Sequence, residues 1–138
     1  MTSHTTGPRA ALAALRDRRS KALGRRGEQL AVAHYERLGY RVLARNHRTR
    51  FGELDLVLAD PGDHTIVFCE VKSRRAGSGP VWENLHPAKR RQVRSMAAAW
   101  LTEVQDRPWA AELRFDAIGV VLDDRSRLVR LDHLEAAF

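Results

Sequence analysis

Cysteine and long hydrophobic runs are the features that this 138-residue sequence most clearly lacks. Its single cysteine, Cys69, excludes an internal disulfide and any zinc site built from several thiolates. No segment approaches the roughly 18 consecutive apolar residues of a membrane-spanning helix, and the first residues form no apolar block of the secretory type. We therefore expect a soluble, cytoplasmic protein that has no membrane partner.

The chain is also too short for two independent hydrophobic cores. With 138 residues, of which 43% are hydrophobic, it can bury one core of ordinary size. We expect a single folded domain over residues 23–138, preceded by a flexible basic extension over residues 1–22 with some helical character near residues 10–15.

Acidic residues are scarce in the segments where positive charge is concentrated. The formal net charge is +7, and residues 1–26 carry seven Lys and Arg side chains against one acid. Residues 37–50 carry five arginines and no acid, and residues 72–94 carry seven basic side chains against Glu83 alone. A solvated surface and a disordered tail would also explain such segments, but their grouping favours a protein that binds nucleic acid.

Hydrophobic periodicity predicts an α/β fold, namely a mixed β-sheet flanked by α-helices. A helix begins near Gly27 and ends at Gly39, and a second helix begins at Pro87. The turn Asp60-Pro61-Gly62-Asp63 predicts a hairpin between two of the strands. The predicted strands cover residues 40–46, 53–59, 66–72, 113–122 and 127–131.

Four charged residues lie in the two strands of that predicted hairpin. Side chains at i and i+2 of a strand point to the same face, so Glu53 is grouped with Asp55, and Glu70 with Lys72. Hairpin pairing would bring the two groups together. Buried charges without partners are costly, whereas carboxylate oxygens are the ligands that Mg²⁺ prefers. This pattern predicts a divalent-metal site that acts on phosphoryl groups.

Most of the candidate residues also have a structural explanation, although Asp55 is harder to explain in this way because Leu54 and Leu56 flank it in a strand that otherwise looks buried. Glu53 can accept hydrogen bonds from turn amides or pair with Arg50, and Glu28 can interact with the dipole at the start of a helix. A Glu-Val-Lys sequence on its own often marks the place where a strand leaves the core. We interpret Asp116 as a salt-bridged structural acid and Cys69 as a small core residue.

The combination of motifs is more specific than its parts, and it resembles the bacterial YraN family of uncharacterised proteins. That family is similar in fold to the archaeal Holliday junction resolvases of the restriction-endonuclease-like, or PD-(D/E)XK, superfamily. The resemblance runs from about residue 23 to the C-terminus. It rests on Gly24-Arg25-Arg26-Gly27-Glu28, Gly39-Tyr40, Asn46, Gly52-Glu53-Leu54-Asp55-Leu56-Val57, Phe68-Cys69-Glu70-Val71-Lys72-Ser73-Arg74 and Arg114-Phe115-Asp116.

The resemblance implies a restriction-endonuclease-like domain with a catalytic site for phosphodiester hydrolysis. Asp55 and Glu70 would hold Mg²⁺ or Mn²⁺, and Lys72 would be the catalytic lysine. Glu28 would complete the acidic cluster, with Glu53 as the alternative third acid. The implied activity is a metal-dependent DNA endonuclease, acting for example on branched, recombination or repair intermediates.

Basic side chains beyond the candidate site are expected to contact phosphates and not bases, so sequence preference should be weak. They are Arg74, Arg75, Lys89, Arg90, Arg91 and Arg94. A homodimer would suit a two-fold DNA junction, although no segment of the sequence marks its interface. The alternatives are a nucleic-acid-binding module that is non-catalytic or depends on a partner, and an adaptor whose basic face meets an acidic protein.

Overall fold

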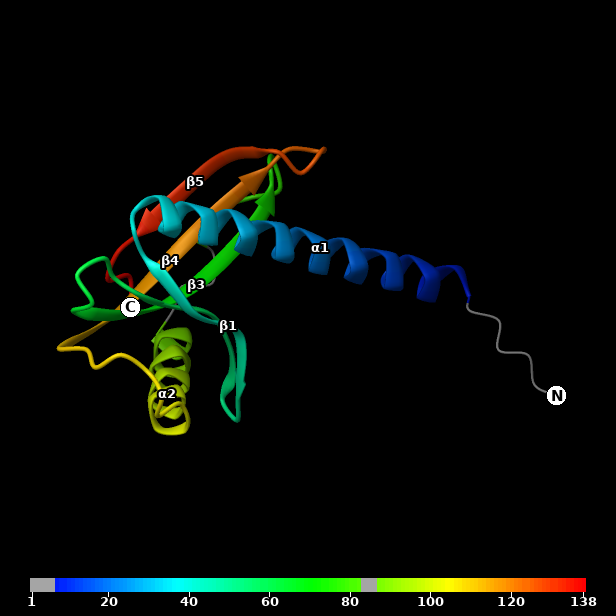
Figure 1. The fold of residues 1–138 in the computed structure, drawn as a ribbon. Helices are drawn as coiled ribbons and strands as arrows, with labels where there is room; N and C mark the ends of the chain where they lie inside the picture. Colours follow the sequence, from blue (N-terminus) through cyan, green and yellow to red (C-terminus); the bar gives the residue numbers. More distant parts are fainter. Residues whose placement is uncertain (1–6, 83–86) are drawn as a thin grey trace.

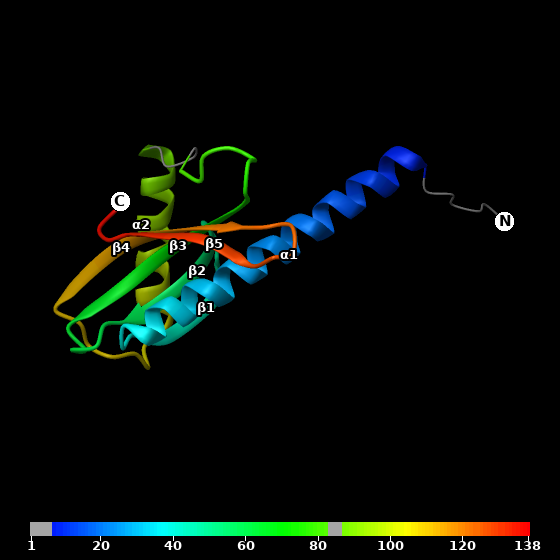
Figure 2. The same cartoon turned by 90° about the horizontal axis from the view of Figure 1, so that it is seen from above.

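The computed structural model describes residues 7–82 and 87–138. In these residues the chain forms two helices and five strands, which are labelled in Figures 1 and 2. Their bounds are α1 Pro8–Arg37, β1 Arg41–Thr49, β2 Gly52–Ala59, β3 Thr65–Arg75, α2 Pro87–Glu103, β4 Glu112–Leu122 and β5 Leu128–Leu134. None of the helices in the described residues is long and apolar enough to cross a membrane.

The five strands form one mixed sheet in the order β1-β2-β3-β4-β5. Neighbouring strands are antiparallel except β3 and β4, which are parallel and are connected through α2. The predicted hairpin between β2 and β3 is confirmed, and Asp60 stabilises its turn by accepting hydrogen bonds from the backbone of His64 and Thr65. The predicted α/β fold with a mixed sheet is therefore confirmed.

The two helices cover opposite faces of the sheet, so there are two hydrophobic clusters (Figures 1 and 2). Successive side chains of β3 point alternately into the two clusters. Val67 and Cys69 pack in the cluster that includes α1, whereas Ile66 and Phe68 pack in the cluster that includes α2. Cys69 is 2% exposed, which confirms its prediction as a core residue.

The sheet divides between β2 and β3. Their register runs from Ala59↔Ile66 to Leu56↔Cys69 and stops there, whereas β3 stays paired with β4 as far as Arg75. The outer part of the β1-β2 hairpin therefore separates from β3, as Figure 1 shows. Asp55 and Glu70 are the first residues beyond the last paired position on their respective strands.

Gly27 permits the close packing of α1 against β3 beside this division. A Cβ atom at Gly27 would collide with the Ser73 Oγ atom, so any other residue here would force the Ser73 side chain to move. This close approach places the next residue of the helix, Glu28, beside the opening between β2 and β3.

The first helix is much longer than the sequence predicted. It begins at Pro8, whereas the hydrophobic pattern predicted a helix only from about Gly27. Ala, Leu, Arg and Lys are strong helix formers, and proline is favoured at the first helical position, which accounts for the additional turns without a buried stripe. The helix is thus continuous across the expected boundary at residue 22, and residues 1–6 of the expected extension lie outside the described residues.

Candidate active site

Asp55 and Glu70 lie at the division of the sheet and are joined through the backbone of β3. The Val71 N–H donates a hydrogen bond of 2.8 Å to the Asp55 Oδ2 atom. Because β2 has already left the ladder, this carboxylate takes the place of a backbone acceptor. Glu70 is only 6% exposed, so its charge is almost completely removed from water.

Two lysines converge on Glu70 from different elements. Lys72 lies on β3 with its Nζ atom 3.6 Å from the Glu70 Oε1 atom. Lys89 lies in the first turn of α2 with its Nζ atom 3.0 Å from the same oxygen. Sequence reasoning had placed Lys89 on a phosphate-binding surface, because nothing in the sequence shows that the start of α2 packs beside Glu70.

The negative charges of this group repel one another. Burial and the nearby Glu70 raise the pKa of Asp55 to about 8, against the opposing effect of the Val71 hydrogen bond. Burial also raises the pKa of Glu28, with the charge of Glu53 adding to the effect and a hydrogen bond with Asn46 opposing it. The protein's own cations therefore leave Asp55 and Glu28 short of positive charge.

Glu28 and Glu53 border a hollow of about 340 Å³ next to the buried acids. Its other lining residues are Lys21, Gly24, Arg25 and Asn46. The Glu53 side chain is 41% exposed and pairs at 3.6 Å with Arg48, not with Arg50, which was the ion-pair partner that the structural alternative named. The Arg50 guanidinium lies over the Phe51 ring.

The predicted metal ligands are brought together only in part. Asp55 and Glu70 are close enough to interact strongly, whereas the part of the chain that the structure describes contains no group of three His, Cys, Asp or Glu side chains suited to one metal ion. Mg²⁺ is commonly held by one or two carboxylates and several waters. The Asp55 and Glu70 oxygens fit that requirement, and the raised pKa of Asp55 shows that additional positive charge would be favourable there.

Apart from Lys89, the predicted phosphate-binding residues fall into two groups. Arg75 donates hydrogen bonds to the Asp123 carbonyl and the Ser126 hydroxyl, and Arg94 donates to the Phe138 carbonyl while lying over the Phe115 ring. These contacts tie the end of β3 and the middle of α2 to other parts of the fold. The other arginines of the predicted set remain at the surface, with Arg90 and Arg91 exposed and Arg74 half-buried.

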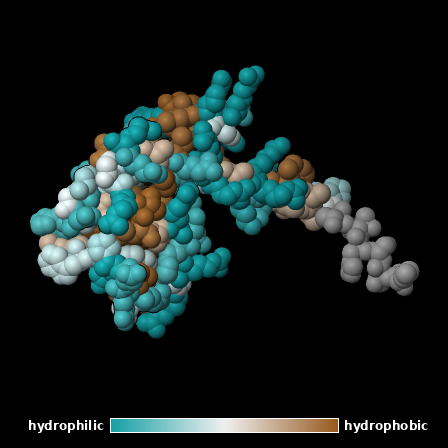
Figure 3. Space-filling view, viewed as in Figure 1, coloured by the Kyte–Doolittle hydropathy of each residue, from teal (hydrophilic) through white to brown (hydrophobic). Residues whose placement is uncertain are grey.

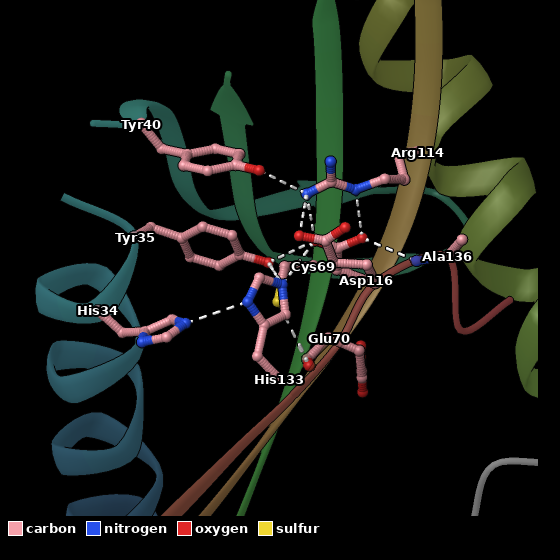
Figure 4. A network of polar contacts seen from close by, with 10 residues as sticks. His34, Tyr35, Tyr40, Cys69, Glu70, Arg114, Asp116, His133 and Ala136 are labelled. Carbon is pink, nitrogen blue, oxygen red and sulfur yellow. Dashed lines mark hydrogen bonds and ion pairs between the residues drawn. The ribbon is translucent and has the colours of Figure 1, made fainter. Parts of the chain in front are cut away.

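A second buried acid, Asp116, lies on the other face of the sheet (Figure 4). It is fully buried and stands opposite Cys69 in the register of β3 and β4, so it faces α1. Arg114 donates to both of its carboxylate oxygens at 2.8 Å, and the Tyr35 hydroxyl donates at 2.9 Å. His133 Nε2 lies 2.8 Å from the carboxylate, and the Ala136 N–H donates at 3.1 Å.

These partners more than offset the burial of Asp116. Burial raises the pKa of the Asp116 carboxyl. The hydrogen bonds from Arg114 and His133 lower this pKa by more than burial raises it, so the net shift is downward. This agrees with its prediction as a salt-bridged structural acid. Sequence reasoning missed the rest of the network, in which His34 Nε2 lies 3.0 Å from His133 Nδ1. These two histidines are 99 positions apart, and no local sequence pattern connects residues at that separation.

Comparison with known proteins gives a consistent result. Residues 27–120 match the family described as "Uncharacterised protein family UPF0102". A UPF0102 protein of Mycobacterium avium is 46% identical over 114 residues, covering 82% of this chain and 87% of the relative. UPF0102 proteins of Mycolicibacterium smegmatis (47% identity; 81% and 89% covered) and Bifidobacterium longum (42%; 86% and 94%) are also similar.

These matches cover the sheet through most of β4, the helix segment that carries Glu28, and both strands of the candidate site. They confirm the resemblance that the motifs indicated, and the chain belongs to the UPF0102 (YraN) family.

Proposed function

We propose that this protein is a metal-dependent endonuclease that hydrolyses phosphodiester bonds in DNA. The observation that carries the proposal is the position of Asp55 and Glu70, two interacting carboxylates at the point where β2 and β3 separate. An acid with a strongly raised pKa beside a second acid and two lysines is typical of a catalytic site. A carboxylate serving only stability would be expected to have its own protein partners, as Asp116 has.

The residues at this point match the chemistry of phosphodiester hydrolysis. Asp55 and Glu70 would hold Mg²⁺ or Mn²⁺, which when bound neutralises charge on a phosphoryl group and lowers the pKa of water. The Lys72 side chain is 27% exposed, so its ammonium can reach a phosphate oxygen or orient a water while remaining near Glu70. Lys89 holds the Glu70 carboxylate in position from α2.

A nucleic-acid substrate is supported by the basic surface around the site. Arg74, Arg90 and Arg91 would contact the phosphate backbone, which predicts weak sequence preference and strong salt dependence. Within this proposal, branched DNA of the recombination and repair type is the preferred substrate. A homodimer in the cytoplasm would present two sites to such a junction.

The proposal is tested by incubating labelled duplex, single-stranded, flap and four-way junction DNA with the protein and Mg²⁺ or Mn²⁺. We expect cleavage that falls at least about 100-fold in Asp55→Asn and in Lys72→Ala, because each loses a charge placed at the reacting phosphate. Asp124→Asn is the matched control, since this acid is exposed in the turn between β4 and β5. Cleavage that survives in Asp55→Asn would contradict the proposal.

One observation favours a second candidate, a nucleic-acid-binding module that does not cleave. Lys72 and Lys89 both approach Glu70, so the fold already places two cations beside this acid. If the protein is such a module, the wild type and the Asp55→Asn variant should bind DNA equally well, and neither should cleave any substrate. Lys89→Ala separates the two functions further, because a metal-dependent enzyme should then bind Mg²⁺ more tightly.

A further inference from the structure

The N-terminal half of α1 extends away from the folded body as an isolated helix (Figures 1 and 2). The buried residues of α1 begin at Gly27, and residues 8–22 are exposed throughout. At about 1.5 Å per residue, this exposed part is roughly 20 Å long. We call residues 8–26 the arm; it ends where the match to the UPF0102 family description, over residues 27–120, begins.

The arm is strongly basic. It carries seven Lys and Arg side chains and a single acid, Asp17. Figure 3 shows a mainly hydrophilic surface along it, with a hydrophobic patch towards its outer end, where Leu12 and Leu15 are exposed. Two leucines cover far less than the roughly 800 Å² that each partner buries in an ordinary protein interface.

Three of the basic residues form a row on one side of the helix. At about 100° per residue, Arg18, Lys21 and Arg25 lie within roughly 60° of one another around the helix axis. Glu28 follows three residues later on the same side. We call Arg18, Lys21 and Arg25 the basic row.

The basic row leads directly into the hollow beside the candidate active site. Lys21 and Arg25 line that hollow together with Glu28 and Glu53. The cations therefore continue from the arm to within one helical turn of an acid that interacts electrostatically with Asp55. A ligand that follows the basic row would be delivered to the division between β2 and β3.

Intramolecular ion pairing does not account for the row. Lys21 pairs with Asp17 at 3.1 Å, but both side chains are more than 60% exposed, and such pairs are weak. Across residues 7–82 and 87–138, no acid pairs with Arg18 or Arg25. Like charges three and four residues apart destabilise an isolated helix, so a bound polyanion would relieve an existing repulsion.

We propose that the basic row binds the phosphate backbone of a nucleic acid and guides it to the Asp55-Glu70 site. This inference rests on the proposed function for the identity of the ligand. The row forms mainly charge contacts, so it adds affinity and orientation and does not read bases.

The test compares two triple variants of the full chain that lose the same charge from the same helix. Arg18→Gln, Lys21→Gln and Arg25→Gln remove the basic row. Arg9→Gln, Arg16→Gln and Arg19→Gln remove three arginines from the other side of the arm. Glutamine is a good helix former, so circular dichroism should show equal helicity in both variants.

Binding of fluorescent four-way junction and duplex DNA is measured by anisotropy over a range of KCl concentrations. We expect removal of the basic row to reduce the slope of log K against log salt by about 2 to 3 and to weaken binding at least about 10-fold at low salt. The control variant should change the slope by less than about 1. Equal losses in both variants, or wild-type binding without the row, would overturn the inference.

The outcome is separable from that of the proposed function. If the row is needed for binding but no DNA is cleaved by any variant, the arm binds nucleic acid and the nuclease proposal fails. If wild-type cleavage persists without the row and the salt slope is unchanged, the inference about the arm fails and the nuclease proposal stands.

Discussion

Asp55 and Asp116 are aspartates in the same sheet whose surroundings differ in one important respect. Asp116 is fully buried and accepts hydrogen bonds from Arg114, Tyr35 and a backbone N–H, with His133 also within hydrogen-bond distance. Asp55 accepts a hydrogen bond from the Val71 N–H and lies near another buried acid. The pKa of Asp116 is lowered, and that of Asp55 is raised.

The comparison shows how one fold uses the same residue type for two purposes. Around Asp116 the protein supplies enough positive charge and donors to stabilise the carboxylate. Around Asp55 the separation of β2 and β3 leaves the charge partly unsatisfied, so a cation from outside would be favourable. This contrast should be visible in the free energy of unfolding.

The largest effect is expected when Asp116, whose charge has several protein partners, is changed. Asp116→Asn should lower the free energy of unfolding by about 3–5 kcal/mol, because it leaves the half-buried Arg114 guanidinium with only the exposed Glu135 carboxylate at 3.9 Å as an ionic partner. Urea denaturation measures the change, with Asp124→Asn as the exposed control. A loss below about 1 kcal/mol would show that this network is not a major source of stability.

The corresponding change at Asp55 should have the opposite effect and raise the free energy of unfolding. Because the folded protein raises the pKa of Asp55, the unfolded chain loses this proton first as pH rises, and the wild type loses stability between about pH 4 and pH 8. Without divalent metal, Asp55→Asn should therefore be more stable at pH 7 by about 1–2 kcal/mol and unchanged near pH 3. A variant less stable than wild type at pH 7 would contradict the contrast.

The smallest effect concerns the metal itself. Millimolar Mg²⁺ should raise the free energy of unfolding of the wild type by about 1 kcal/mol, since a ligand that binds only the folded state stabilises it. Thermal unfolding should show a shift of a few degrees in wild type and in Asp116→Asn, but none in Asp55→Asn. KCl of equal ionic strength controls for screening, and an equal shift in all three proteins would indicate no specific site at Asp55.

Local patterns predicted the framework and the centre of the candidate site. The alternation in residues 53–59, the turn at Asp60 and the apolar strand before Lys72 are all short-range signals, and they predicted the hairpin that brings Asp55 close to Glu70. The end of the first helix at Gly39 was also predicted correctly, because a glycine with a φ of +88° takes a conformation that other residues rarely adopt.

The same patterns failed for features that depend on distant segments. Burial periodicity gave no signal for the arm, since a helix exposed on all sides has no apolar stripe, and its formation depends on helix propensity instead. Lys89 was predicted at the surface but pairs with Glu70, because the packing of α2 beside β3 sets that contact. The partnership of His34 and His133 likewise depends on α1 crossing β5.

The sequence by itself therefore determined the fold class, the hairpin and the residue types available for chemistry, because periodicity and turn signals act over a few residues. Only the tertiary structure decided which acids remain short of positive charge. That property depends on where β2 leaves β3, which cations reach each carboxylate and how far water is excluded, and all three are set by contacts between segments far apart in the chain.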